Sequence, residues 1–401
     1  MRLSLKDLQY LVSGAADEFL TADLPADPLS LQKALRKCVG PDEAMAIDQL
    51  RRVRKKAAAK MPLPQAEKML ADDTMIQQAS SLAIAAYKGQ KILQRWPDVR
   101  HVLDLCCGCG LDAIGLAKCG LTVDGYDESS AAVFCASYNA AVCGCEKCCT
   151  FHNADVTLLK NFSAGSVVHL DPDRRVTGRR SASLADYSPG PRFVEELIRQ
   201  PGLRGVIKLS PAMPKDELAA LCMPLDIEYV STHNTCRQLL AWFPAVGEGS
   251  RLATVIRGEY PDYRVDSVFA AAGPAAYGAA AGKYLIEPDA AVLAAGAESA
   301  LAMKLSAWKL APGLVWLFAD KKPATDTAGQ IFEIIQSVPG RLDDIKKALK
   351  NLNAGNVELK TRGVDLNADK VQRQLHGKGT QPLTVLWGRV GLNQLAFIAK
   401  R

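Results

Sequence analysis

The most regular pattern along the chain is a short apolar run that breaks into a turn and is followed by helical spacing. Residues 102–105 are typical of a buried strand, and a turn of small residues comes directly after them. The apolar positions of residues 114–117 then predict a helix, and residues 121–126 predict a second strand that ends on Asp127. This order of elements, a strand, a glycine-containing turn, a helix and a second strand that ends on an acid, is typical of the first unit of a nucleotide-binding α/β fold.

Strand and helix patterns continue to alternate up to residue 258, which predicts a mainly parallel, doubly wound sheet. Further strands are expected at 150–154, 166–170 and 205–209, and others, antiparallel near one edge, at 227–231, 238–243 and 252–256. Ligands of such sheets lie beyond the carboxyl ends of the strands. The pattern therefore gathers four acids on one rim: Asp104, Asp127, Asp155 and Asp171.

The pattern changes on both sides of this sheet. Residues 1–97 are predicted to be helical, and a stretch of small residues at 259–283 is predicted to be a linker. The pattern of residues 284–401 predicts a compact α+β module, which begins with an alanine-rich helix that reaches about residue 304. It continues with strands and helices at 331–335, 342–352, 357–360 and 368–375 and a hairpin-like pair at 383–389 and 394–398. The expected domains are thus 1–97, 98–258 and 284–401.

Composition narrows the class of protein. The chain has 401 residues, of which 48% are hydrophobic, enough for a sizeable core in two or three domains. It contains no run of 18 apolar residues, and its N-terminus lacks the core of a signal peptide. Twelve cysteines, several of them adjacent, fit a reducing compartment better than a disulfide framework. These features predict a cytoplasmic protein.

Positive charge is concentrated in the tail. Residues 321–401 hold fourteen Lys and Arg against seven Asp and Glu, a net +7, whereas the whole chain carries +6. This asymmetry predicts a module that faces RNA, although a lysine-rich solvated surface is the alternative. Lys360 and Arg362, at the end of a predicted strand, are the expected phosphate contacts. The basic run at 51–56 is interpreted either as a second phosphate contact or as a solvated helix face.

The turn at 104–112 reads D-L-C-C-G-C-G-L-D. It lacks the three glycines of a dinucleotide turn, and the chain has no G-x-x-x-x-G-K-[ST] loop. The turn resembles motif I of Rossmann-like S-adenosylmethionine-dependent methyltransferases, D-L-x-C-G-x-G; a tight turn without a cofactor is the alternative. Glycines allow close approach of the backbone to a ligand, and Asp127 can accept hydrogen bonds from two ribose hydroxyls. The resemblance implies S-adenosylmethionine as cofactor, with these residues around it: Asp104, Cys106, Gly108, Gly110, Asp127 and Asp155.

Asp171-Pro172-Asp173-Arg174-Arg175 is the second motif. It resembles the D/N-P-P-Y/F/W motif of amino-group methyltransferases, in which the acid and a loop carbonyl orient the target amine. Asp171 and Pro172 match that motif, whereas Asp173 and Arg174 replace the second proline and the aromatic residue. Lys208 is interpreted as an orienting group, or equally as half of a structural ion pair. Four arginines predict a basic loop that recognises phosphate or carboxylate, the alternative being a surface loop: Arg174, Arg175, Arg179 and Arg180.

Cysteines form one further cluster, with four thiols between residues 143 and 149. Four thiolates can hold zinc, but the paired C-x-x-C spacing of a zinc ribbon is absent, and we expect no metal. The cysteines of the turn at 104–112 are interpreted as small packing residues rather than nucleophiles.

Taken together, the chain resembles a bacterial family of S-adenosylmethionine-dependent methyltransferases that end in a THUMP-like domain. The resemblance rests on the two motifs above and on Gln77-Gln78-Ala79-Ser80, Lys208-Leu209-Ser210-Pro211 and 359–364. A helical segment before a Rossmann-like core also looks like the guanine-N2 methyltransferases of RNA caps. The resemblance implies methylation of a nucleobase in RNA, such as tRNA or rRNA. Two alternatives are a small-molecule methyltransferase and a non-catalytic RNA-binding protein with a relict fold.

Overall fold

The structure is a computed structural model that describes residues 2–159, 162–163, 165–174, 181–221, 223–270, 273–324 and 327–401. It divides into two compact units. The first consists of Met1–Asp226, Gln238–Gly249 and Ile256–Arg264, and the second of Ile227–Arg237, Ser250–Val255 and Val265–Arg401. The domain boundaries drawn from the sequence at 97, 258 and 283 remain predictions.

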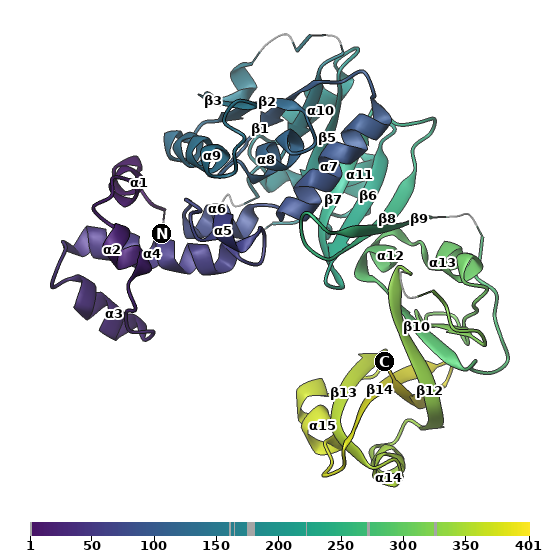
Figure 1. The fold of residues 1–401 in the computed structure, drawn as a ribbon. Coiled ribbons are helices and arrows are strands. Elements are labelled where there is room, and N and C mark those ends of the chain that lie inside the picture. The colour runs from purple at the N-terminus through teal and green to yellow at the C-terminus, as the bar shows by residue number, and fades with distance from the viewer. Residues whose placement is uncertain are drawn as a thin grey trace. The chain divides into compact units, whose positions relative to one another are not determined.

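The first unit begins with seven helices, as the sequence pattern of residues 1–97 predicts. Several of these helices are capped at the N-terminus by a side chain that accepts a hydrogen bond from a backbone N–H of the first turn. The capping residues are Ser4, Asp27, Asp72 and Ser81. The helices are α1 (Leu5–Val12), α2 (Asp17–Thr21), α3 (Pro28–Leu35), α4 (Pro41–Ala57), α5 (Leu63–Ala66), α6 (Asp73–Gln78) and α7 (Leu82–Arg95) (Figure 1).

The basic run at 51–56 lies on α4, and several of its charges are used inside the first unit. Arg51 donates to two backbone carbonyls before α3, at 2.6 and 3.1 Å, and Arg54 donates to the carbonyl of Met69 at 3.3 Å. Lys56 forms an ion pair with Asp73 at 2.5 Å. These contacts use several charges of the run within the unit, which weakens its interpretation as a phosphate-binding surface.

A mostly parallel sheet follows, in the order β3-β2-β1-β4-β5-β7. The first five strands pair in parallel, and β7 runs antiparallel to β5, which confirms the doubly wound α/β prediction and its antiparallel edge. The strands are β1 (His101–Leu105), β2 (Thr122–Asp127), β3 (Cys149–Asn153), β4 (Val167–Leu170), β5 (Arg204–Leu209) and β7 (Thr235–Phe243). The helices are α8 (Leu111–Ala117), α9 (Ser130–Val142), α10 (Pro191–Arg199) and α11 (Lys215–Ala219). Two 3-10 turns complete the set, Val156–Leu158 and Leu184–Asp186.

Helices α7 and α8 pack closely because one of them carries a glycine at the contact. A Cβ atom added to Gly115 would come within 2.2 Å of the Cβ of Ala85, so the absence of a side chain lets the two backbones approach. This approach brings Lys88 of α7 next to Asp112 of α8, 2.5 Å apart. The packing of the two helices thus sets the polar contacts described below.

The second unit contains a separate sheet in the order β11-β10-β12-β15-β14-β13. Its elements are β10 (Tyr284–Pro288), α12 (Ala290–Ala295), α13 (Glu298–Lys304), β11 (Leu317–Ala319), β12 (Gly329–Pro339), α14 (Leu342–Asn351), β13 (Ala354–Arg362), α15 (Ala368–Leu375), β14 (Gln381–Val390) and β15 (Asn393–Lys400). Most of β6 (Asp226–Thr232), β8 (Arg251–Arg257) and β9 (Arg264–Phe269) also belongs to this unit.

The predicted α+β tail is confirmed, with differences in its first part. The alanine-rich helix is divided into α12 and α13 at Gly296, which adopts a φ of 68°. The fully buried strand β10 precedes it, and β9 lies within the predicted linker. Helices α14 and α15 lie beside β12 and β13 and cover a core that includes Ile345, Leu349, Val357, Leu375 and Ile398 (Figure 1). None of the helices in the described ranges is long and apolar enough to cross a membrane.

Candidate active site

A cavity of about 220 Å³ opens in the first unit, at the carboxyl ends of β1, β2 and β4. Its lining includes seven acidic side chains, Asp72, Asp112, Asp127, Glu128, Asp155, Asp171 and Asp173, and two basic ones, Arg2 and Arg174. Because carboxylates outnumber guanidinium groups around it, the cavity has a negative electrostatic potential. It is therefore suited to a cationic or hydrogen-donating ligand.

The turn after β1 forms one wall of this cavity. Cys106, Gly108 and Gly110 all have positive φ, at 63°, 54° and 82°. A Cβ added to Gly108 would meet no atom within 4 Å, so this side of the turn is open, whereas a Cβ on Gly110 would come within 3.0 Å of Ala136. Gly108 thus leaves the room for a ligand against the backbone, and Gly110 is required by the packing of α8 against α9. Gly110 itself does not appear among the lining residues.

Asp127, at the end of β2, faces the same cavity. Its Oδ2 accepts from the N–H of Gly108 at 2.9 Å, and its Oδ1 accepts from the N–H of Ser129 at 3.0 Å. Burial raises the pKa of Asp127, and these two backbone N–H groups oppose the shift. Each carboxylate oxygen has two lone pairs, so the side chain can still accept from two ligand hydroxyls.

Asp155 lies at the exposed edge of the cavity, just after β3. Its Oδ1 accepts from the backbone N–H and the hydroxyl of Thr157, at 2.9 and 2.7 Å, and these hydrogen bonds lower its pKa. The side chain is therefore an acceptor fixed in direction, and it can receive a further donor at its other oxygen.

The segment after β4 brings Asp171, Pro172, Asp173 and Arg174 to the cavity. The backbone of Asp173 exchanges two hydrogen bonds with that of Ser188, at 2.8 and 2.9 Å, which fixes the segment. Lys208, on β5, is 3% exposed and forms an ion pair with Asp171. Its Nζ also donates to the carbonyl of Gln78 at 3.1 Å. Lys208 therefore lies behind the cavity wall and orients Asp171, but it does not line the cavity itself.

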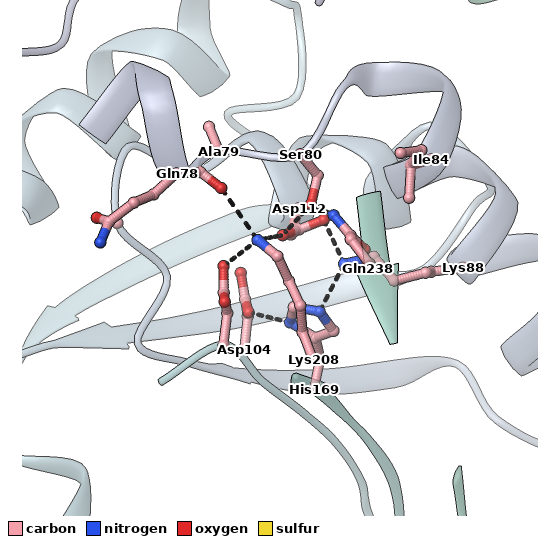
Figure 2. A network of polar contacts seen from close by, with 12 residues as sticks. Gln78, Ala79, Ser80, Ile84, Lys88, Asp104, Asp112, His169, Lys208 and Gln238 are labelled. Carbon is pink, nitrogen blue, oxygen red and sulfur yellow. Dashed lines mark hydrogen bonds and ion pairs between the residues drawn. The ribbon is translucent and has the colours of Figure 1, made fainter. Parts of the chain in front are cut away.

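Behind Asp171, buried side chains of alternating charge continue into the core (Figure 2). Asp112 lies 3.9 Å from Lys208 and 2.5 Å from Lys88. Lys88 contacts Nε2 of His169 at 2.7 Å, and Nδ1 of His169 lies 2.6 Å from Asp104. Burial alone would raise the pKa of Asp112, but the ammonium groups of Lys88 and Lys208 hold it below its ordinary value. Burial lowers the pKa of Lys88 and raises that of Asp104.

Asp104 is consequently placed differently from the expectation. Its carboxylate is fully buried, hydrogen-bonded to His169 and absent from the lining of the cavity. Because it points into the core, direct contact with a cofactor is not the role that this position supports. Cys106 does line the cavity, and burial raises the pKa of its thiol well above the ordinary value. A protonated thiol is a poor nucleophile, in keeping with a packing role.

The predicted substrate contacts have different surroundings. Arg174 lines it, whereas Arg175, Arg179 and Arg180 lie outside the described residues. In the second unit, Lys360 and Arg362 both pair with the buried Glu287, at 2.8 and 2.6 Å. Their charges are therefore partly neutralised within the unit, which weakens the case for them as phosphate contacts.

Within the described part of the chain, no group of three or more His, Cys, Asp or Glu side chains is arranged to hold a metal ion. In the cysteine loop, the thiol of Cys145 instead donates to the carbonyl of Cys143 at 3.7 Å, and that of Cys149 donates to the carbonyl of Ala113 at 3.8 Å. Eleven cysteines are described, and none of them forms a disulfide within the described residues.

The cavity also receives residues that sequence reasoning did not assign to it. The N-terminal helical segment contributes Arg2, Leu3, Asp72, Thr74, Met75, Gln78 and Ala79. The only signal in the sequence was the resemblance that included Gln77-Gln78-Ala79-Ser80, which named a family but gave no location. Contacts such as that of Gln78 with Asp173 join residues 95 positions apart, and neither periodicity nor spacing reports such a distance.

Comparison with known proteins decides the class of enzyme. Residues 99–172 match the family described as RNA cap guanine-N2 methyltransferase, and residues 329–401 match the family described as THUMP domain-like. The chain is 28% identical, over 352 residues, to a Mycobacterium tuberculosis protein described as an uncharacterized S-adenosylmethionine-dependent methyltransferase, in strains CDC 1551 / Oshkosh and H37Rv. The match covers 86% of this chain and 93% of the relative. The chain is an S-adenosylmethionine-dependent methyltransferase with a C-terminal THUMP-like domain.

The fold of this methyltransferase agrees with that assignment. A protein from Porphyromonas gingivalis W83 that is named as a methyltransferase shares the fold, with a TM-score of 0.73, 15% sequence identity and coverage of 100% of both chains. The cavity fits the cofactor on its own evidence, because Gly108 leaves room beside the backbone and Asp127 offers acceptors at the end of β2. The excess of acidic side chains around it also favours a sulfonium cation.

Proposed function

We propose that this methyltransferase acts on an amino group of a nucleobase in RNA, either tRNA or rRNA. We also propose that its C-terminal module binds the RNA. The single observation that carries the proposal is the placement of Asp171 and Pro172 at the edge of an acidic cavity. An exocyclic amine donates hydrogen bonds and carries no charge, so it suits a carboxylate acceptor in such a cavity.

In this proposal the residues of the chain bind and align the reactants. S-adenosylmethionine, when bound, supplies the methyl group. Asp127 accepts from the ribose hydroxyls and Asp155 from the adenine amino group, while Gly108 lets the cofactor approach the backbone. Asp171 and the carbonyl of Pro172 accept hydrogen bonds from the target amine. Methyl transfer is an in-line displacement, for which such alignment matters more than acid–base chemistry.

Lys208 contributes by holding Asp171 in place. It is buried and paired with that carboxylate, so the direction of Asp171 is set before a substrate arrives. An acceptor that is already oriented needs no reorganisation when the amine binds, which favours the aligned geometry.

Docking of RNA is proposed for the surface of α14 and α15 rather than for Lys360 and Arg362. Exposed basic residues lie on α14, on α15 and just after α15, and we call them together the surface of α14 and α15: Lys346, Lys347, Lys350, Lys370, Arg373 and Lys378. Exposed lysine and arginine side chains suit the phosphate backbone, with little preference for sequence. The match of residues 329–401 to the THUMP domain-like family supports the same assignment. A cytoplasmic location is proposed as well, since the described cysteines form no disulfides with one another.

The proposal is tested by comparing the modified nucleosides of RNA from the parent strain and from a strain that lacks the gene. We expect one methylated nucleoside to disappear from tRNA or rRNA in the deletion strain, and to return with the wild-type gene but not with Asp171→Ala. Identical nucleosides in both strains would contradict the RNA assignment and favour a small-molecule substrate. A purified protein that fails to bind S-adenosylmethionine would favour the non-catalytic alternative.

A further inference from the structure

Gln78 occupies an unusual position between the helical segment and the catalytic edge of the sheet. It is the last residue of α6, is partly buried and lines the cavity. No chemistry is assigned to it by the proposed function. Its backbone carbonyl contacts Lys208 of β5 (Figure 2), and its side chain contacts Asp173, in the segment after β4.

The side chain of Gln78 contacts Asp173. Its Nε2 donates to Oδ1 of Asp173 at 2.7 Å, across 95 residues of sequence. The backbone of Asp173 is fixed by Ser188, and the amide of Gln78 holds one oxygen of its carboxylate. Arg2 approaches the other oxygen of Asp173 at 3.5 Å, but the Arg2 side chain is 72% exposed and contributes a weak contact.

The backbone of Gln78 contacts Lys208. Its carbonyl accepts from Nζ of Lys208 at 3.1 Å, across 130 residues of sequence. Lys208 in turn pairs with Asp171. One residue of α6 therefore holds the carboxylate of Asp173 through its side chain and supports the direction of Asp171 through Lys208.

We propose that Gln78 is a positioning residue for methyl transfer, which sets the two carboxylates of Asp171 and Asp173 as a pair of acceptors for the substrate. This inference rests on the proposed function. It assigns to the N-terminal helical segment a direct part in the geometry of the reaction, because α6 holds the segment that contacts the target amine.

Three variants separate this role from simple packing. Gln78→Ala removes the N–H donor and keeps the backbone carbonyl. Gln78→Glu keeps the size of the side chain but replaces the donor with a carboxylate facing Asp173. Gln77→Ala is the matched control, because Gln77 lies on the same helix, is exposed and does not line the cavity.

The experiment measures methyl transfer from tritiated S-adenosylmethionine to RNA extracted from a strain that lacks the gene, together with cofactor affinity by calorimetry. We expect Gln78→Ala and Gln78→Glu to lower the rate at saturating RNA by about tenfold to a hundredfold. Gln77→Ala should keep the wild-type rate, and all three variants should keep the wild-type affinity for S-adenosylmethionine.

Three results would overturn the inference. A wild-type rate for Gln78→Glu would reduce Gln78 to a packing residue, and a loss of cofactor affinity in Gln78→Ala would make it a support of the cofactor pocket. Either result leaves the proposed function standing if the wild-type protein methylates the RNA. Absence of transfer by a wild-type protein that binds the cofactor would instead reject the proposed function, and the role of Gln78 with it.

Discussion

Nζ of Lys88 lies 2.7 Å from Nε2 of His169 in the core of the first unit, where neither side chain is exposed to solvent. A lysine ammonium can only donate, so Nε2 of His169 accepts, and its Nδ1–H points to Asp104. The pair connects α7 to β4 beneath the cavity. A buried polar chain of this kind is costly to interrupt, because each remaining member keeps its charge without a partner.

Replacement of Lys88 is therefore expected to destabilise the fold. Lys88→Met leaves Asp112 with one fewer cation and should lower the free energy of unfolding by about 3–5 kcal/mol, the usual cost of breaking a buried ion pair. Urea unfolding followed by circular dichroism measures this change. Lys91→Met, on the same helix, is the control and should change stability by less than about 0.5 kcal/mol. Equal stability of the two variants would show that the buried contacts of Lys88 contribute little.

Asp127 is expected to contribute directly to cofactor affinity. Asp127→Ala removes the acceptor for the ribose hydroxyls and should weaken S-adenosylmethionine binding by about 1–3 kcal/mol, the range for lost hydrogen bonds to a charged group. Calorimetry on the folded protein measures the affinity. Asp124→Ala is the control, since Asp124 lies on the same strand but does not line the cavity. An unchanged affinity for Asp127→Ala would remove Asp127 from the ribose role.

Asp171 is expected to affect turnover without affecting the cofactor. Asp171→Ala should abolish methyl transfer to RNA, because the amine loses its acceptor, whereas S-adenosylmethionine affinity stays close to that of the wild type. The two measurements are made on the same preparation. If rate and affinity fall together, Asp171 supports the cofactor pocket or the fold instead.

The surface of α14 and α15 is expected to bind RNA through phosphates. In the full chain, Lys347→Glu combined with Lys350→Glu should weaken RNA binding and reduce the slope of log affinity against log salt by about 1.5. Both side chains are exposed on α14. Filter binding at several salt concentrations gives the slope.

The control makes the same change of charge elsewhere. Lys33 and Lys37 are exposed in the N-terminal segment, and their reversal to glutamate should leave the slope near that of the wild type. Two double variants with the same loss of affinity would mean that overall charge, rather than the surface of α14 and α15, determines RNA binding.

Local patterns predicted much of the fold. Strand ends such as Asp127 and the bounds of α15 follow from period and capping, which depend on residues a few positions apart. The sequence Glu287-Pro288-Asp289 illustrates the limit. Asp289 does cap α12, as a helix start would require, but Glu287 and Pro288 belong to the buried strand β10, which the pattern did not predict.

The site was predicted less completely, because its contacts join distant parts of the chain. Asp127 and Asp171 were found from their place at strand ends, a rule that sequence can apply. The partners of Lys360 could not be found in this way, since Glu287 lies 73 positions earlier and only tertiary packing brings the two together. The contact of Gln78 with Lys208 is of the same kind.

The most direct test of the central claim is transfer of a tritiated methyl group from S-adenosylmethionine to RNA extracted from a strain that lacks the gene, with RNA from the parent strain as the matched substrate. We expect the wild-type protein to label the RNA of the deletion strain and to label that of the parent strain much less, because its sites are already methylated. Asp171→Ala should label neither. A wild-type protein that binds S-adenosylmethionine and labels neither RNA would contradict the central claim.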